Sequence, residues 1–213
     1  MDIVSGVGVI DKGVAILQTL AEGPLDLVAL QHATDLPRAT AHRLVVALET
    51  HHLVRRDAAG RFCLGFELIR LGRVAADEFP IAELATPALT ALRNSTGESV
   101  QLFVREHDTR RCVVSLQSDH ALQWLVPVGA VLPLGAGSAG KVLGDTALAR
   151  AESVEEREKG VASVSAAVVD RRGAIVAAVS ISGPVERLTR TPGRKFGAAV
   201  AEAARQVSAA IAR

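Results

Sequence analysis

Apolar residues recur at helical spacing in three short stretches within the first fifty residues of the chain. The first stretch runs from Gly8 to Ala21, with its apolar side at Val9, Gly13, Ile16, Leu17 and Leu20. The second begins at Asp26, a residue type that favours the N-cap of a helix, and ends at Thr34. After a tight turn at residues 35 and 36, Pro37 stands where proline is tolerated, at the start of a third helix. This pattern predicts three helices, of which the second and third form a helix-turn-helix.

The third predicted helix has one apolar and one polar side. Its apolar side consists of Ala41, Leu44, Val45 and Leu48. The residues that remain outside near its start are Arg38, Thr40, His42 and Arg43. Side chains at such positions reach base edges and phosphates when a recognition helix enters the major groove of DNA. Small helical bundles contain the same corner without binding DNA, so this stretch alone leaves both interpretations open.

A hairpin is predicted directly after the third helix. Residues 53–56 and 61–64 read as two short strands around a turn from Asp57 to Gly60, and both residue types favour turns. Three helices followed by a hairpin make a winged helix-turn-helix. Arg55 and Arg61 then lie on the wing, where they are candidates for contact with the DNA backbone or minor groove.

Charge supports DNA binding only locally. Residues 1–79 hold eight Lys and Arg against ten Asp and Glu, so this part of the chain is not basic as a whole. From Arg38 to Arg61, however, five arginines face only Glu49 and Asp57. A phosphate-binding surface needs a basic face rather than a basic domain, and this segment can supply one.

The rest of the chain changes pattern twice. The apolar pattern of residues 65–79 predicts a helix that joins the two halves of the chain. This helix has more apolar residues than one buried side requires, which indicates either a dimer contact or packing within the chain; they are Phe66, Ile69, Leu71 and Val74. Beyond it we expect helices and strands at residues 81–96 (helix), 99–105, 111–116, 122–126, 161–169 and 174–182 (strands), and 192–212 (helix). This order predicts an antiparallel sheet with helices packed on it, and therefore an α+β protein. We expect one domain at residues 1–64, a linker at residues 65–79 and a second domain at residues 80–213.

Composition places the chain among folded proteins. It has 213 residues, 49% of them apolar, and a formal net charge of +1. No apolar run approaches the roughly 18 residues of a membrane span, and residues 1–5 have no secretory pattern, so we expect a cytoplasmic protein that does not bind membranes. The two cysteines, Cys63 and Cys112, are too few for a disulfide framework or a zinc site, and we expect both to be reduced core residues without a metal.

One glycine-rich segment imitates a nucleotide-binding motif. Residues 135–141 match both G-x-G-x-x-G and the first part of a phosphate-binding loop. However, Val142 stands where such a loop needs Ser or Thr for magnesium, and Pro133 does not suit a central strand. No serine-hydrolase elbow or metalloprotease motif occurs either, so we expect neither a nucleotide cofactor nor an enzyme.

Five segments in the right order carry a resemblance to a known family. Residues 6–12, 36–44, 60–65, 160–163 and 179–184 together resemble the IclR family of bacterial transcription regulators. Within the family the chain is most similar to the compact actinobacterial members that control leucine and other amino-acid biosynthesis genes. The resemblance implies a winged helix-turn-helix, a linker helix and a GAF-like effector-binding domain. It also implies a homodimer or dimer of dimers on double-stranded operator DNA.

The resemblance further implies a pocket for a small metabolite, a carboxylate or an amino acid. Its walls would be Gly137, Ser138, Ala139, Ser163, Ser180 and Ser182. Alternation along a strand places Ser180 and Ser182 on one face, which agrees with two hydroxyls in one cavity but also with a solvated face. The alternative function is a ligand-sensing module whose helix-turn-helix binds proteins rather than specific DNA.

The chain departs from the family in two places. Ser153 stands where carboxylate-sensing relatives often have Asp, and Ser163 replaces their Cys. Relatives also carry two further helices between Lys141 and Gly160, where this chain has eighteen residues, from Val142 to Lys159. Either the chain is shortened or residues are missing from it. We expect the second, with a Cα spacing above ~3.8 Å somewhere from Gly140 to Glu158, because losing two helices would uncover the sheet.

Overall fold

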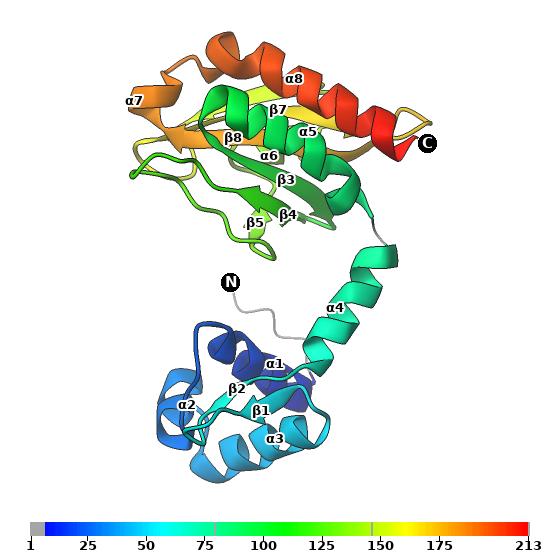
Figure 1. The fold of residues 1–213 in the computed structure, drawn as a ribbon. Coiled ribbons are helices and arrows are strands. Elements are labelled where there is room, and N and C mark those ends of the chain that lie inside the picture. The colour runs from blue at the N-terminus through cyan, green and yellow to red at the C-terminus, as the bar shows by residue number, and fades with distance from the viewer. Residues whose placement is uncertain (1–6, 79, 146, 213) are drawn as a thin grey trace. The chain divides into compact units, whose positions relative to one another are not determined.

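The computed structural model describes residues 7–78, 80–145 and 147–212 (Figure 1). The chain divides into two compact units, Met1–Phe79 and Pro80–Arg213. Among the described residues, none of the helices combines the length and apolar character that crossing a membrane requires.

The first unit is the predicted winged helix-turn-helix followed by a further helix. Its elements are α1 (Gly8–Ala21), α2 (Leu27–Thr34), α3 (Arg38–Thr50), β1 (Val54–Arg56), β2 (Phe62–Leu64) and α4 (Glu67–Glu78). As expected, Asp26 caps α2, because its Oδ1 accepts a hydrogen bond from the backbone N–H of Ala29 at 2.8 Å. Pro37 occupies the N-cap of α3 rather than its first turn, a shift of one residue.

A small aliphatic core holds the three helices and the hairpin together. Ile16, Leu30 and Val45 are fully buried at its centre, one from each helix. Val54 and Phe62 close the core from the hairpin. This inward packing uses the apolar side of α3 and leaves the opposite side of the helix to solvent.

The second unit is a six-stranded antiparallel sheet with helices on both faces (Figure 1). The strand order is β5-β4-β3-β8-β7-β6. The strands are β3 (Ser99–Glu106), β4 (Thr109–Leu116), β5 (Val131–Pro133), β6 (Arg150–Val154), β7 (Val161–Val169) and β8 (Ile175–Pro184). The helices are α5 (Ile81–Thr96), α6 (Ser138–Gly144), α7 (Val185–Leu188) and α8 (Pro192–Ile211).

One strand prediction for this sheet was wrong, and two strands were not predicted. The expected strand at residues 122–126 does not form, whereas Val131–Pro133 does, and Arg150–Val154 adds a strand that was not predicted. Pro133 is accommodated because β5 lies at the edge of the sheet, where the missing backbone N–H breaks no ladder on its outer side. Short strands of three to five residues carry too little periodicity to be recognised from sequence.

Each face of the sheet has a different character. On one face α5 and α8 lie side by side over aliphatic residues such as Val100, Leu102 and Val179 (Figure 1). On the other face a smaller cluster, with Phe103 and Cys112, packs against α6. Because side chains alternate along a strand, the residues between the aliphatic ones on β3, β7 and β8 all face α6.

The predicted break between Gly140 and Glu158 was wrong, and the chain is instead shortened there. Residue 146 lies outside the described residues, but hydrogen bonds join the chain on its two sides. The backbone N–H of Ala147 donates to Asp145 Oδ1 at 2.9 Å, and that of Leu148 donates to Asp145 O at 3.1 Å. β6 then pairs directly with β7, and this extra strand extends the sheet.

Both cysteines are buried and free, as expected: Cys63 in the wing and Cys112 beneath α6. Burial raises the pKa of the Cys112 thiol to about 12, which keeps it protonated and unreactive. Among the described residues there is also no group of three or more His, Cys, Asp or Glu that could hold a metal ion.

Gly65 offers a test of the packing between the hairpin and α3. A Cβ at this position would lie 2.0 Å from the backbone oxygen of His52, whereas a Cβ at Gly72 in α4 would meet nothing within 4 Å. We expect Gly65→Ala to destabilise the protein by on the order of 3 kcal/mol and Gly72→Ala to stabilise it by about 0.5–1 kcal/mol. Urea unfolding followed by circular dichroism measures both, and equal midpoints for the two variants would contradict the close approach.

Candidate nucleic-acid interface and ligand pocket

The start of α3 presents basic side chains that no described residue engages. Arg38, His42 and Arg43 are exposed, and Thr40 is half-buried. Arg38 and Arg43 make no hydrogen bond or ion pair with any residue that the structure describes. Since the other side of the helix is buried in the core, these cations are oriented outward and remain available for a partner.

The two predicted arginines of the wing differ in how free their charges are. The Arg61 Nε atom donates to Asp57 Oδ2 at 2.8 Å, so its charge is partly neutralised within the turn. Hydrogen bonds from the backbone and side chain of Arg61 hold the pKa of Asp57 below its usual range. The Arg55 guanidinium lies 4.9 Å from the centre of the Phe66 ring, a contact that leaves its charge uncompensated.

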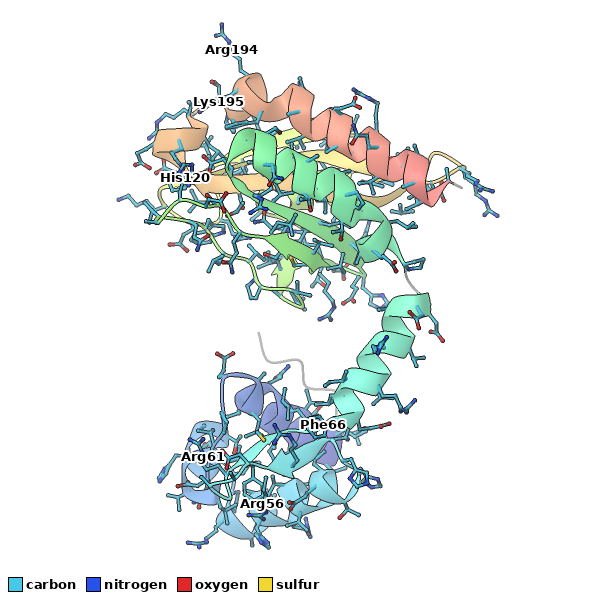
Figure 2. The ribbon with its side chains drawn as sticks, in the orientation of Figure 1. Arg56, Arg61, Phe66, His120, Arg194 and Lys195 are labelled. Atoms are coloured by element: carbon cyan, nitrogen blue, oxygen red, sulfur yellow. The ribbon has the colours of Figure 1, made fainter. Side chains whose placement is uncertain are left out.

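Arg56, by contrast, contacts other residues of the first unit and stabilises the wing (Figure 2). Its Nε atom lies 3.1 Å from Glu49 Oε1, and its guanidinium covers the Phe62 ring at 4.1 Å. The contact with Glu49 connects β1 to the end of α3. Arg56 therefore fixes the wing relative to the recognition helix.

The second unit contains a polar pocket on the sheet face that α6 covers. Strand register places Ser180 opposite both Gln101 and Ser165, and Ser182 opposite Ser163. The pocket encloses a cavity of about 30 Å³, room for about two water molecules. The structure brings together at this cavity all six residues named from the family resemblance: Gly137, Ser138, Ala139, Ser163, Ser180 and Ser182.

The hydroxyl groups of the pocket are largely satisfied by one another. Ser138 Oγ lies 2.7 Å from Ser163 Oγ and 2.7 Å from Ser165 Oγ. Ser182 Oγ donates to Gln101 Oε1 at 2.8 Å. This leaves the Gln101 Nε2 donor buried and without a partner among the described residues.

Arg110 and Arg157 also line the pocket, and sequence reasoning missed both. Arg110 is 1% exposed, its Nη1 atom donates to Pro133 O, and its Nε atom has no partner among the described residues. Burial, and then the nearby Arg157 charge, lower the pKa of Arg110 to about 10. Burial also lowers the pKa of Arg157. The available signal was the alternation of β4, which places Arg110 two residues before the buried Cys112 on the same side.

The glycine-rich segment before α6 makes room for the Arg110 guanidinium. A Cβ at Gly140 would lie 2.3 Å from Arg110 Nη1 and 2.3 Å from Leu134 O. A Cβ at Gly137 would lie 3.2 Å from Arg110 Nη2, and the φ of Gly137 is +82°. The glycine spacing that matches a phosphate-binding loop is thus explained by close packing around the Arg110 guanidinium.

A carboxylate of the protein itself occupies the start of α6. The backbone N–H of Gly137 donates to Glu156 Oε2 at 3.4 Å, and Lys141 Nζ pairs with Glu156 Oε1. We expected this loop to hold the carboxylate of a ligand. In this arrangement the Gly137 N–H already donates to Glu156, whereas the two arginines make no ion pair with a described residue.

The chain is similar to bacterial transcription regulators along most of its length. The profile of the IclR helix-turn-helix domain matches residues 9–58, and that of the bacterial transcriptional regulator IclR C-terminal domain matches residues 74–153 and 145–209. The glycerol operon regulatory protein of Streptomyces coelicolor is 31% identical over 239 residues, covering 93% of this chain and 94% of the relative. The transcriptional repressor IclR of Escherichia coli is 25% identical over 241 residues, covering 93% of this chain and 88% of the relative.

Solved structures share the fold. An IclR homologue from Microbacterium hydrocarbonoxydans, complexed with 4-hydroxybenzoate, matches with a TM-score of 0.81 at 18% identity, covering 95% of this chain and 98% of that one. The alignments also measure the shortening. The match to the Escherichia coli repressor spans 241 residues, whereas 93% of 213 residues is about 198, so about forty aligned positions have no counterpart in this chain.

Gly140→Ala tests the packing of Arg110 against the loop. The added methyl group would overlap a guanidinium and a backbone carbonyl, so we expect a loss of about 1–3 kcal/mol of stability. Gly135→Ala is the matched control, because a Cβ there meets nothing within 4 Å. Urea unfolding can be followed by the fluorescence of Trp124, the one tryptophan of the chain, which lies in the same unit. Equal stability of the two variants would show that Arg110 does not fill this space.

Proposed function

The chain belongs to the IclR family of DNA-binding bacterial transcription regulators, and we propose that it represses its target genes as a homodimer whose operator affinity depends on a small metabolite. The family consists of regulators rather than enzymes. The observation that carries the proposal is the outward face of α3, where Arg38 and Arg43 are exposed and engaged by no described residue. Repression follows the relatives, one of which is named a transcriptional repressor.

The proposed DNA contacts divide between α3 and the wing. Arg38 and Arg43 contact bases or phosphates in the major groove, with His42 beside them, and Thr40 contacts a phosphate or a thymine methyl group. Arg55 and Arg61 contact the backbone or minor groove. Because Arg61 already pairs with Asp57, Arg55 contributes more of the wing's attraction for phosphate.

An apolar surface on α4 supports the proposed dimer. None of the α4 residues is buried, and Ile69 and Val74 are 61% and 47% exposed. Phe66, which directly precedes the helix, is 70% exposed and extends this surface. Exposed apolar residues concentrated on one helix mark interaction sites. A second copy of the chain would cover this surface, and a twofold dimer would hold two recognition helices at the spacing of a palindromic operator. A dimer of dimers would extend the same arrangement.

The proposed regulation requires a ligand in the second unit. The relative bound to 4-hydroxybenzoate supports a small carboxylate or amino acid as the class of ligand. A coupling of about 1–3 kcal/mol between ligand and operator would suffice to switch a promoter. For the target genes we propose amino-acid biosynthesis, leucine included, although a relative with 31% identity is named for a glycerol operon. Mapping the genomic sites that the protein occupies tests this assignment and supplies the operator.

Arg43→Ala tests the recognition helix. If Arg43 reads a base, its loss should weaken specific operator binding by about 1–3 kcal/mol and leave nonspecific binding nearly unchanged. Arg172→Ala, which removes an exposed arginine from a turn of the second unit, is the control for net charge. Gel-shift titrations at fixed salt on the mapped operator give both values. Unchanged operator affinity of Arg43→Ala would favour a protein-binding role for the head.

Ile69→Glu tests the dimer. A carboxylate in the apolar surface of α4 should dissociate the dimer into monomers, because burying an unpaired charge is costly. Val28→Glu is the matched control, since Val28 is 50% exposed on α2 of the same unit. Sedimentation velocity at micromolar concentration distinguishes the species. An Ile69→Glu protein that remains dimeric would place the interface elsewhere.

A further inference from the structure

The pocket holds two arginines and too little negative charge to balance them. Arg110 makes no ion pair among the described residues, and its guanidinium lies 5.5 Å from the centre of the Phe103 ring. Arg157 is half-buried, makes no ion pair within the described chain, and lies 5.3 Å from the centre of the Trp124 ring. The acidic residue at the cavity, Glu158, is exposed and offsets only part of the Arg157 charge. Burying an uncompensated cation is costly, so this arrangement needs an explanation outside stability.

Two donor groups of the pocket also lack hydrogen-bond acceptors. Arg110 Nε and Gln101 Nε2 are buried donors without a partner among the described residues. The hydroxyls of Ser138, Ser163 and Ser165 bind one another, and that of Ser182 binds Gln101 Oε1, so these hydroxyls do not satisfy the two donors. A molecule that brings oxygen acceptors and negative charge would satisfy both.

The cavity and the positions of the arginines define the shape of that molecule. About 30 Å³ is room for a small polar group such as a carboxylate. Pro133 O accepts a hydrogen bond from Arg110, and Gly137 and Gly140 leave space for its guanidinium. The half-buried Arg157 lines the same cavity and supplies a second positive charge.

We propose that the ligand of this pocket is a small dianion, with one acidic group on Arg110 and the second on Arg157. A short dicarboxylate has this chemistry, because its two carboxylates stand at opposite ends of one molecule. The inference rests on the proposed sensor function and names the class of its ligand. Arg110 is the anchor, and Arg157 selects ligands with two acidic groups over those with one.

Matched probes test the requirement for two acidic groups. Succinate and butyrate have four carbons each but two and one carboxylates, and glutarate and valerate differ in the same way with five carbons each. Trp124, the one tryptophan of the chain, lies beside Arg157 and reports binding through its fluorescence. At fixed ionic strength we expect at least one dianion to bind about tenfold or more tightly than its matched probe. Equal affinity within both pairs, or no response to any probe, would overturn the proposal.

Substitutions at Arg157 and Arg110 test the proposed roles of these residues in selecting and anchoring the ligand. Arg157→Gln should lower the affinity for the dianion to that of its matched probe, while Arg172→Gln, in an exposed turn, should leave it unchanged. Arg110→Met should abolish binding yet melt no lower than the unmodified protein without ligand, because it removes a buried unpaired charge. A lower melting temperature would mark Arg110 as structural and overturn its role as anchor. If Arg110→Met does not fold, Arg157→Gln decides alone, and an unchanged preference there overturns the proposal.

Operator binding by the same preparations separates this inference from the proposed function. A protein that binds its operator but fails the probe tests retains the DNA-binding function and loses the dianion assignment. A protein that binds dianions but no operator keeps the ligand assignment and loses the proposed regulatory function.

Discussion

Burial of one side of each amphipathic element is the constraint on which the rest of this protein depends. In the head, Ala41, Leu44 and Val45 must face the core, and helical spacing then leaves Arg38 and Arg43 outside. In the sheet, the aliphatic residues must face α5 and α8, and a period of two turns the intervening polar residues toward α6. The same physical cause therefore produces both the proposed DNA-binding surface and the ligand pocket.

The pocket keeps a buried charged side chain that packing alone would not favour. A guanidinium that is 1% exposed and lacks an acidic partner within the described chain would be replaced by an apolar side chain if packing alone mattered. Instead, Gly140 in α6 stands where a Cβ would collide with Arg110, and Gly137 before the helix stands where a Cβ would lie 3.2 Å from it. Neighbouring residues are thus adapted to keep this cation in place, which is typical of a functional position.

The shortened connection between α6 and β6 brings the pocket wall close to the loop that precedes α6. Lys141 Nζ donates to the backbone oxygen of Glu152 at 3.1 Å and pairs with Glu156, while Gly137 binds the same carboxylate. Arg157 follows directly in this segment. With about forty positions fewer than the Escherichia coli repressor, the chain forms this side of its pocket from Ser153 in β6 and from Arg157 and Glu158 in the segment that follows it.

Sequence alone determined the elements whose periodicity is long or whose ends are marked by strong signals. The helices 8–21 and 81–96, the strand 161–169 and the hairpin after α3 follow from local spacing, caps and turn residues, and motif order was enough for the family. The short strands Val131–Pro133 and Arg150–Val154 were not predicted, because three to five residues show no clear alternation of apolar and polar positions. Only the tertiary structure showed that Arg110 and Arg157, 47 positions apart in the numbering, face one cavity, and that Glu156 occupies the loop expected to bind a ligand. The reason is physical: local sequence sets which side of an element is apolar, whereas the meeting of charges from distant segments depends on strand register and packing.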